Sequence, residues 1–168
     1  LEQLLSNPEL TPGVRRFLFW ASDLGFKPEI VNAVNSYPEA WTMIYGVKGK
    51  TYAFVYIAHR PRQYPSQSVI KKITGLTGHV DRKKLLEQGL ANVAGEMQPG
   101  HMTPFFSCEF SFNRGLEIVM DKASVEANSP AKFPLGQSHS YVAMPLADIA
   151  IVLRKMYGGN SVKEEKLF

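Results

Sequence analysis

Two apolar stretches on either side of the tight turn Lys48-Gly49-Lys50 constrain the fold of this chain more than any other feature. The first covers residues 42–47, and the second, TYAFVYIA, covers residues 51–58. Both are rich in β-branched and aromatic residues, and a short glycine-bearing turn joins them, which is typical of a β-hairpin. The sequence therefore predicts an antiparallel hairpin over residues 42–58.

Capping residues predict several helices around this hairpin. Thr11-Pro12 has the pattern of an N-cap followed by proline at the first helical position, and apolar residues then recur at helical spacing up to Gly25. Pro145 likewise opens a run with an apolar side that ends at Gly158-Gly159. The other predicted helix starts are Ser66 or Ser68, Asp81 and Asp121.

The remaining segments predict strands and loops. Further strands are expected over residues 26–34, 90–94, 105–112, 116–120 and 140–144. The stretch with Pro130 and Pro134 is expected to be a loop, and residues 160–168 a frayed tail or a linker. Hairpins without strict strand–helix alternation indicate an α+β fold, with a mixed sheet or a partly open barrel.

The 168 residues allow one domain of ordinary size, which we expect over residues 11–158, with flexible segments at 1–10 and 159–168. Apolar residues make up 45% and charged residues 20%, which excludes an intrinsically disordered chain. No apolar run approaches the roughly 20 residues that span a bilayer. The first ten residues contain acids and no basic start, unlike a signal peptide, so we expect a cytoplasmic protein without a membrane partner.

Positive charge is concentrated in one part of the chain. Residues 48–84 hold nine basic residues and one acid, Asp81, a charge of +8; the rest carries −4, since the total is +4. Such a block attracts a polyanion through counterion release, although a solvated lysine-rich surface has the same composition. The residues expected to bind such a partner, a nucleic acid or another phosphate-bearing molecule, are Arg60, Arg62, Lys71, Lys72, Arg82, Lys83 and Lys84.

Common cofactor and metal motifs do not occur. The four histidines form no H-x-x-x-H pair, there is no C-x-x-C, and neither a P-loop nor G-x-G-x-x-G is present. We therefore expect no metal and no cofactor. The single cysteine, Cys108, stands in an alternating apolar run, which favours a buried thiol; a nucleophile would need a basic partner that the sequence does not place.

The loop Gly100-His101-Met102-Thr103-Pro104 is the most informative segment for function. Glycine lets backbone approach a ligand closely, and proline fixes the turn. Such a loop is able to direct successive N–H groups at a carbonyl or a developing oxyanion. Taken alone, G-x-x-x-P is also common in plain surface turns.

Four motifs in this order resemble the YbaK-like editing domains, which are free-standing or synthetase-associated aminoacyl-tRNA deacylases. They are the hairpin TMIYGVKGKTYAFVYIAHR with a basic helical segment after it, the loop GHMTP, the strand and short helix GLEIVMDKASVE, and GQSHSYVAMPLADIAIVL. The opening helix and strand, TPGVRRFLFWASDLGFKPEIV, also look like those of this family. The resemblance covers most of residues 11–157, and the order of the motifs carries it.

The resemblance implies a twisted, mostly antiparallel, barrel-like sheet surrounded by helices. It also implies hydrolysis of mischarged alanyl- or cysteinyl-tRNA for proline, in trans or as part of a synthetase assembly, with tRNA and a synthetase or fused domain as partners. The residues expected to act in catalysis are Gly100, Thr103, Pro104 and His139. The residues expected to bind substrate are His101, Met102, Trp41, Gly136 and Gln137. His139 is a candidate proton shuttle or hydrogen-bond donor, although it and His101 are equally consistent with surface positions.

Two departures from the family leave a second function open. Members carry a lysine at the start of the first hairpin strand, where this chain has Trp41, and the helix between the first two strands is shortened to residues 35–38. An indole neither holds a phosphate nor polarises an ester. The alternative is a catalytically inactive tRNA-binding or assembly module, in which Trp41 stacks on a base or ribose, or fills the former pocket.

Overall fold

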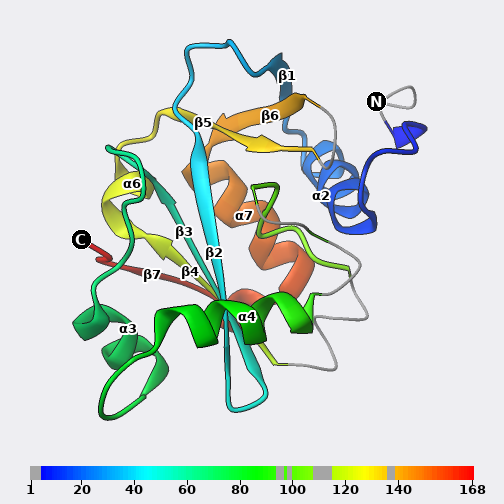
Figure 1. Ribbon diagram of the computed structural model, residues 1–168. Coiled ribbons are helices and arrows are strands. Elements are labelled where there is room, and N and C mark those ends of the chain that lie inside the picture. Colours follow the sequence, from blue (N-terminus) through cyan, green and yellow to red (C-terminus); the bar gives the residue numbers. More distant parts are fainter. Residues whose placement is uncertain (1–4, 94–96, 98–99, 108–114, 136–138) are drawn as a thin grey trace.

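The computed structural model describes residues 5–93, 97, 100–107, 115–135 and 139–168, and it places them in helices and two sheets (Figure 1). The helices are α2 (Pro12–Asp23), α3 (Gln67–Thr74), α4 (Arg82–Asn92), α6 (Lys122–Glu126), α7 (Leu146–Tyr157) and the short 3-10 helix η1 (Gly159–Ser161). The strands are β1 (Glu29–Asn32), β2 (Ala40–Val47), β3 (Lys50–Ile57), β4 (Leu116–Asp121), β5 (Pro130–Pro134), β6 (Ser140–Pro145) and β7 (Val162–Glu165).

The larger sheet has the strand order β2-β3-β4-β7, and the smaller has the order β1-β6-β5. β2 pairs antiparallel with β3, while β3, β4 and β7 run parallel to one another. Both pairs of the smaller sheet are antiparallel. The expected α+β fold with mostly antiparallel pairing is confirmed, but the strands form two sheets and not a closed barrel.

Local signals of the sequence set the hairpin and the helix starts. Lys48 and Gly49 both have positive φ, 49° and 78°, as a two-residue hairpin turn requires. The side chains of Thr11, Ser66, Asp81 and Asp121 each accept a hydrogen bond from a backbone N–H in the first turn of the helix that follows, as expected of N-caps. These helices therefore begin where the capping residues predicted.

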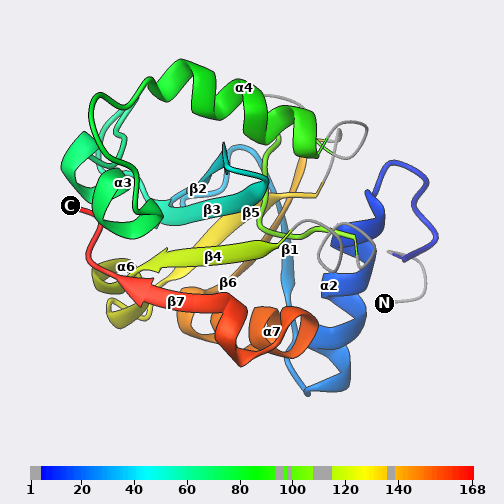
Figure 2. The same ribbon diagram turned by 90° about the horizontal axis from the view of Figure 1, so that it is seen from below.

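Alternate residues of the hairpin face opposite sides of the larger sheet. Ile44 and Ala53 lie in one buried cluster with residues of α2 and α7. Tyr45 and Phe54 lie in a second cluster with Ile70 of α3 and residues of α4. Figure 2 shows α4 on one side of the sheet and α7 on the other. Both faces of the hairpin are therefore buried, which explains its uninterrupted apolar run.

Helix α4 also packs closely against β2, the first strand of the larger sheet. A Cβ atom on Gly89 would lie 2.1 Å from the backbone oxygen of Ile44, and one on Gly46 would lie 2.8 Å from the backbone of Gln88. Glycine at both positions is therefore required for this approach. The helix therefore crosses the second half of β2, around Ile44 and Gly46.

Several predictions of strand and loop positions were wrong. Residues 90–92 end α4 and form no strand, because the helix started by Asp81 continues through them. Residues 105–107 lie outside the strands; residues 108–112, with Cys108, are outside the described part. The strand expected over residues 26–34 is reduced to β1. The expected loop with Pro130 and Pro134 is the edge strand β5, where prolines at the strand ends are tolerated.

The C-terminal segment is also more ordered than the frayed tail that was expected. Residues 162–165 form β7 and pair with β4. Leu167 is buried, and its N–H donates to the Asp121 carboxylate across 3.1 Å. The charged pattern of this segment gave no strand signal because only one of its faces is covered.

Candidate functional site

A small cavity lies at the beginning of β2, on the side of this strand that faces away from β3. Its volume is about 250 Å³. This is slightly below the roughly 300–1,000 Å³ of pockets for drug-sized ligands, so the cavity suits a small group. Its lining consists of Glu39, Ala40, Trp41, Thr42, Met43, Tyr64, Gly100, Met102 and Pro134.

The cavity wraps around the free edge of β2. Five consecutive residues, 39–43, line it, although neighbouring side chains of a strand point to opposite faces. Ala40 and Met102 belong to the cluster on the α7 side, whereas Trp41 and Tyr64 pack on the α4 side. The backbone of an edge strand leaves half of its N–H and C=O groups without a ladder partner. The cavity therefore borders backbone groups that are able to bind a ligand.

A fork between the two sheets creates this space. The N–H of Lys132 in β5 donates to the backbone oxygen of Pro38 across 2.9 Å, and Glu39 and Lys132 form a parallel bridge. This bridge is isolated, and no ladder joins β2 to β5 among the described residues, so the two strands part beyond it. Pro134 of β5 then faces residues 40–43 of β2 across the cavity.

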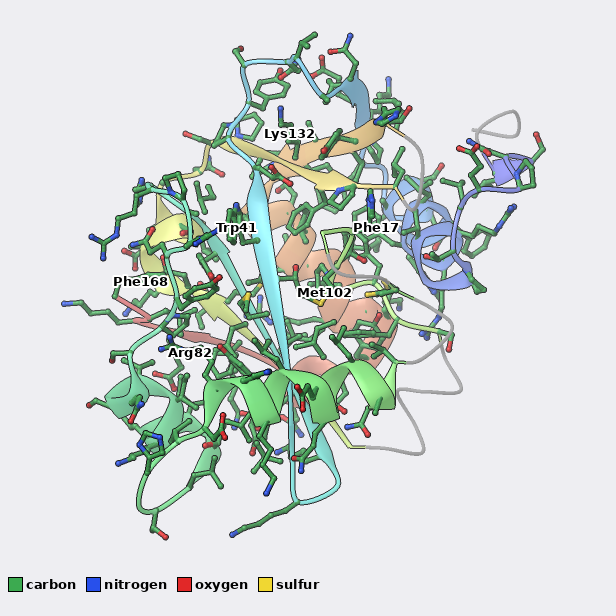
Figure 3. All side chains as sticks on the ribbon, viewed as in Figure 1. Phe17, Trp41, Arg82, Met102, Lys132 and Phe168 are labelled. Carbon is green, nitrogen blue, oxygen red and sulfur yellow. The ribbon has the colours of Figure 1, made fainter. Side chains whose placement is uncertain are left out.

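The loop that the sequence singled out closes one side of the fork. Gly100 has a φ of 85° and lines the cavity together with Met102. Met102 is labelled in Figure 3. The next two residues face the interior. The buried Thr103 accepts from the N–H of Phe105 across 3.3 Å, and the backbone oxygen of Pro104 accepts from the Tyr157 hydroxyl across 3.2 Å. The end of the loop is thus anchored, while its beginning borders the cavity.

Trp41 and Tyr64 form the opposite wall. Trp41 is half-buried and lines the cavity without filling it. The guanidinium of Arg82 lies over the Tyr64 ring, 5.2 Å from its centroid, and Nη2 donates to the Pro65 oxygen across 2.8 Å. Figure 3 shows Trp41 and Arg82 on the same side of β2, with Met102 on the other.

The lining is mostly apolar and contains few polar side chains that could bind a ligand. Glu39 supplies a carboxylate at the exposed rim. Burial, and next to it the Glu39 charge, raise the pKa of the nearby Tyr141 hydroxyl, over whose ring the Lys132 ammonium lies. Thr42 is only 4% exposed, and its hydroxyl has no hydrogen-bond partner among the described residues.

The structure brings only some of the predicted substrate and catalytic residues together. Trp41, Gly100 and Met102 share the cavity, whereas Thr103 and Pro104 are buried and do not line it. The remaining candidates are not at the lining: His101 is half-buried, and His139 is exposed at the start of β6. Gly136 and Gln137 lie outside the described residues.

Sequence reasoning missed several lining residues. Thr42 follows Trp41 on β2 and Glu39 comes just before this strand, so treating the segment as an edge strand would have found them. Tyr64 and Pro134 gave no such signal, because only the tertiary fold brings them to the cavity.

The basic residues of the 48–84 segment differ in their surroundings. Arg60, Arg62, Lys72, Lys83 and Lys84 are exposed. Arg60 and Arg62 precede Tyr64 of the cavity wall, whereas Lys48 and Lys50 lie at the other end of the hairpin. Lys50 is bound to the buried Glu117 carboxylate at 2.7 Å, which leaves it less free for a ligand.

Two other properties bear on the kind of site. Within the described ranges, no group of three or more His, Cys, Asp or Glu side chains is placed to hold a metal ion. None of the helices that the structure describes has the length and apolar character needed to cross a bilayer.

Comparison with known proteins shows a shared fold and no family. No family model and no curated protein matches the chain. A scaffold protein from the computational grafting of epitope backbones is 13% identical, with 94% of this chain and 97% of that chain aligned at a TM-score of 0.55. Hypothetical protein APE2540 is 12% identical, with 89% and 97% aligned at 0.54. A candidate trans-editing enzyme for prolyl tRNA synthetase is 13% identical, with 94% and 98% aligned at 0.49, too low to support a function.

Proposed function

We propose that this protein hydrolyses the ester bond of a mischarged aminoacyl-tRNA, with the small aminoacyl group held in the cavity at the edge of β2. The proposal depends on one observation. Trp41, Gly100 and Met102, which the family resemblance selected from distant parts of the sequence, line one cavity of about 250 Å³. This volume has room for an alanyl or cysteinyl group.

The lining suggests how each part of the substrate is held. The apolar walls formed by Ala40, Met43 and Met102 take the side group, and the Glu39 carboxylate faces the α-ammonium of the aminoacyl ester. Backbone N–H groups near Gly100 and along the free edge of β2 are the donors for the ester carbonyl. Specificity then comes from cavity size, because polar groups are few.

The reaction is hydrolysis and needs no cofactor. A water molecule adds to the ester carbonyl, and the charge that develops on its oxygen is stabilised by the loop amides. The bond to the terminal ribose oxygen then breaks, and that oxygen takes the proton released by the water. The vicinal hydroxyl of the substrate's own ribose is the candidate for relaying this proton. The products are the free amino acid and the tRNA.

A catalytically inactive tRNA-binding module is the second candidate. One observation favours it: the described lining contains no lysine, histidine or cysteine, and Trp41 stands where the family has lysine. The open cavity beside Trp41 favours hydrolysis, because an indole that filled the space would exclude substrate.

The test is release of the amino acid from alanyl- and cysteinyl-tRNA for proline by the purified chain. Gly100→Ala is expected to abolish release, since φ at this position is 85° and alanine strains or moves the loop. Gly25→Ala is the matched control: its φ is 84°, and it lies after α2, away from the cavity lining.

Three outcomes separate the candidates. Release that Gly100→Ala abolishes and Gly25→Ala retains supports the hydrolase. Salt-sensitive tRNA binding without release supports the inactive module, and Trp41→Lys then tests whether the scaffold gains activity. Neither binding nor release overturns both candidates.

A further inference from the structure

Arg82 differs from the other basic residues of its segment in what it contacts. The sequence places it among the residues expected to bind tRNA phosphates. In the structure its guanidinium lies over the Tyr64 ring, and Nη2 donates to the oxygen of Pro65. Tyr64 lines the cavity, and the next residue, Pro65, is buried. Arg82 therefore links the start of α4 to the wall of the cavity.

This position has an energetic cost that an exposed cation would avoid. The Nε atom of Arg82 is buried and has no hydrogen-bond partner among the described residues, and the same holds for the Tyr45 hydroxyl. Burial raises the pKa of Tyr45 to about 12, although the charge of the nearby Arg82 and a side-chain interaction with it act in the opposite direction. The Arg82 guanidinium therefore lies between the Tyr45 hydroxyl and the Tyr64 ring, turned toward the cavity wall and not toward a phosphate in solvent.

The wall that Arg82 contacts lies in a segment without regular structure, although Tyr64 packs against the cluster on the α4 side. Residues 58–66 belong to no helix or strand. The Tyr56 hydroxyl donates to the backbone oxygen of Gln63, and Gln63 Oε1 accepts from the N–H of His59 across 2.9 Å. These contacts fix the chain before Tyr64, while Arg82 fixes the ring itself and the residue after it.

We infer that Arg82 is a positioning residue that holds the Tyr64 ring at the cavity and thereby limits the size of the group that the cavity admits. This inference rests on the proposed function, because it concerns the same cavity. It assigns Arg82 a part in selectivity and removes it from the set of free phosphate contacts. One missing or added methylene in an apolar pocket changes selectivity about 10- to 200-fold, so a modest shift of the ring has a measurable effect.

The first measurement needs no ligand. Arg82→Met keeps the length and apolar stem of the side chain and removes the guanidinium. Lys122→Met is the matched control, because Lys122 is exposed and is also the first residue of a helix capped by an aspartate, Asp121. In protein labelled with ¹³C in its tyrosine rings, Arg82→Met is expected to shift and sharpen the Tyr64 signals, while Lys122→Met leaves them unchanged. An unchanged Tyr64 in folded Arg82→Met overturns the inference.

The second measurement tests selectivity with small probes that contain no phosphate. Alaninamide and leucinamide, stable stand-ins for the two esters, are titrated while the indole N–H signal of Trp41 is followed; Trp20 is the internal reference. The wild type is expected to prefer alaninamide by at least about tenfold, and Arg82→Met to reduce this preference about tenfold. Arg82→Lys, which keeps the charge but not the flat contact, is expected to give an intermediate preference.

The outcomes separate this inference from the proposed function. A preference that survives in Arg82→Met overturns the inference and leaves the proposed function standing. Equal binding of both amides by the wild type also overturns the inference and leaves hydrolysis as the proposed function. Binding of neither amide overturns the use of the cavity for aminoacyl groups, and size selection with it, while the tyrosine signals still report whether Arg82 holds Tyr64.

Discussion

Replacing Asp121 should loosen the residues after β7 and lower the free energy of unfolding. This buried carboxylate accepts hydrogen bonds from the N–H of Ser124 across 3.2 Å, from the Ser124 hydroxyl across 2.7 Å and from the N–H of Leu167 across 3.1 Å. It therefore caps α6 and binds the residues after β7 at the same time. Asp121→Ala removes all three acceptor contacts.

The expected loss follows from these contacts. Removal of an N-cap costs about 1 kcal/mol, and each buried donor left without a partner costs about 1–3 kcal/mol. For the buried Leu167 N–H and the Ser124 hydroxyl together with the cap, we expect a loss of about 3–7 kcal/mol in the free energy of unfolding. Total stabilities are about 5–15 kcal/mol, so this is a large part of the whole.

The assay is urea unfolding combined with amide hydrogen exchange. Asp81→Ala is the matched control, because Asp81 caps α4 through a single exposed hydrogen bond to the N–H of Lys84; we expect it to cost about 1 kcal/mol. The Leu167 amide should exchange much faster in Asp121→Ala alone. An equal loss in the two variants, or a Leu167 amide that stays protected, would refute the reasoning.

Three further predictions concern other parts of the fold. Gly89→Ala should destabilise the protein by at least about 1–3 kcal/mol in urea unfolding, because the added Cβ overlaps the Ile44 oxygen, whereas Gly159→Ala, which meets nothing within 4 Å, should have little effect. Burial raises the pKa of Glu117, but hydrogen bonds from Lys163 and Lys50 outweigh it and hold this pKa below its usual value of 4.5. Its stabilising effect is therefore present above pH 4.5 and lost as the pH falls through the lowered pKa, and Glu117→Gln should flatten the stability profile in that acidic range. Lys132→Met should cost about 2 kcal/mol and speed amide exchange near Asn35, because the buried ammonium donates to the oxygens of Ala33 and Asn35; unchanged exchange there would contradict this role.

The parts of the fold that the sequence predicted are those set by local chemistry. Thr11 and Asp81 cap the helices they precede, and the turn at Lys48 and Gly49 fixes the hairpin register. The strands β5 and β7 were missed, because each is a short edge strand whose residues show no clean alternation.

The cavity was only partly predictable, for a different reason. Gly100 and Trp41 could be selected by resemblance to a family pattern, whereas Tyr64 and Pro134 reach the lining only through long-range packing. The role inferred for Arg82 is invisible in the sequence, since its neighbours Lys83 and Lys84 carry the same charge and are exposed. A composition argument treats the three as equivalent, although their surroundings differ.

The fork at the start of β2 makes the cavity sensitive to how the two sheets are oriented. Near the cavity the sheets are joined at the bridge between Glu39 and Lys132, and the Lys132 ammonium extends this junction to residues 33–35. A small rotation of one sheet about that junction widens or narrows the space between β2 and Pro134. A ligand bound in this space would fix the angle between the two sheets. Its binding should therefore reduce motion in β1 and β6, although neither strand lines the cavity.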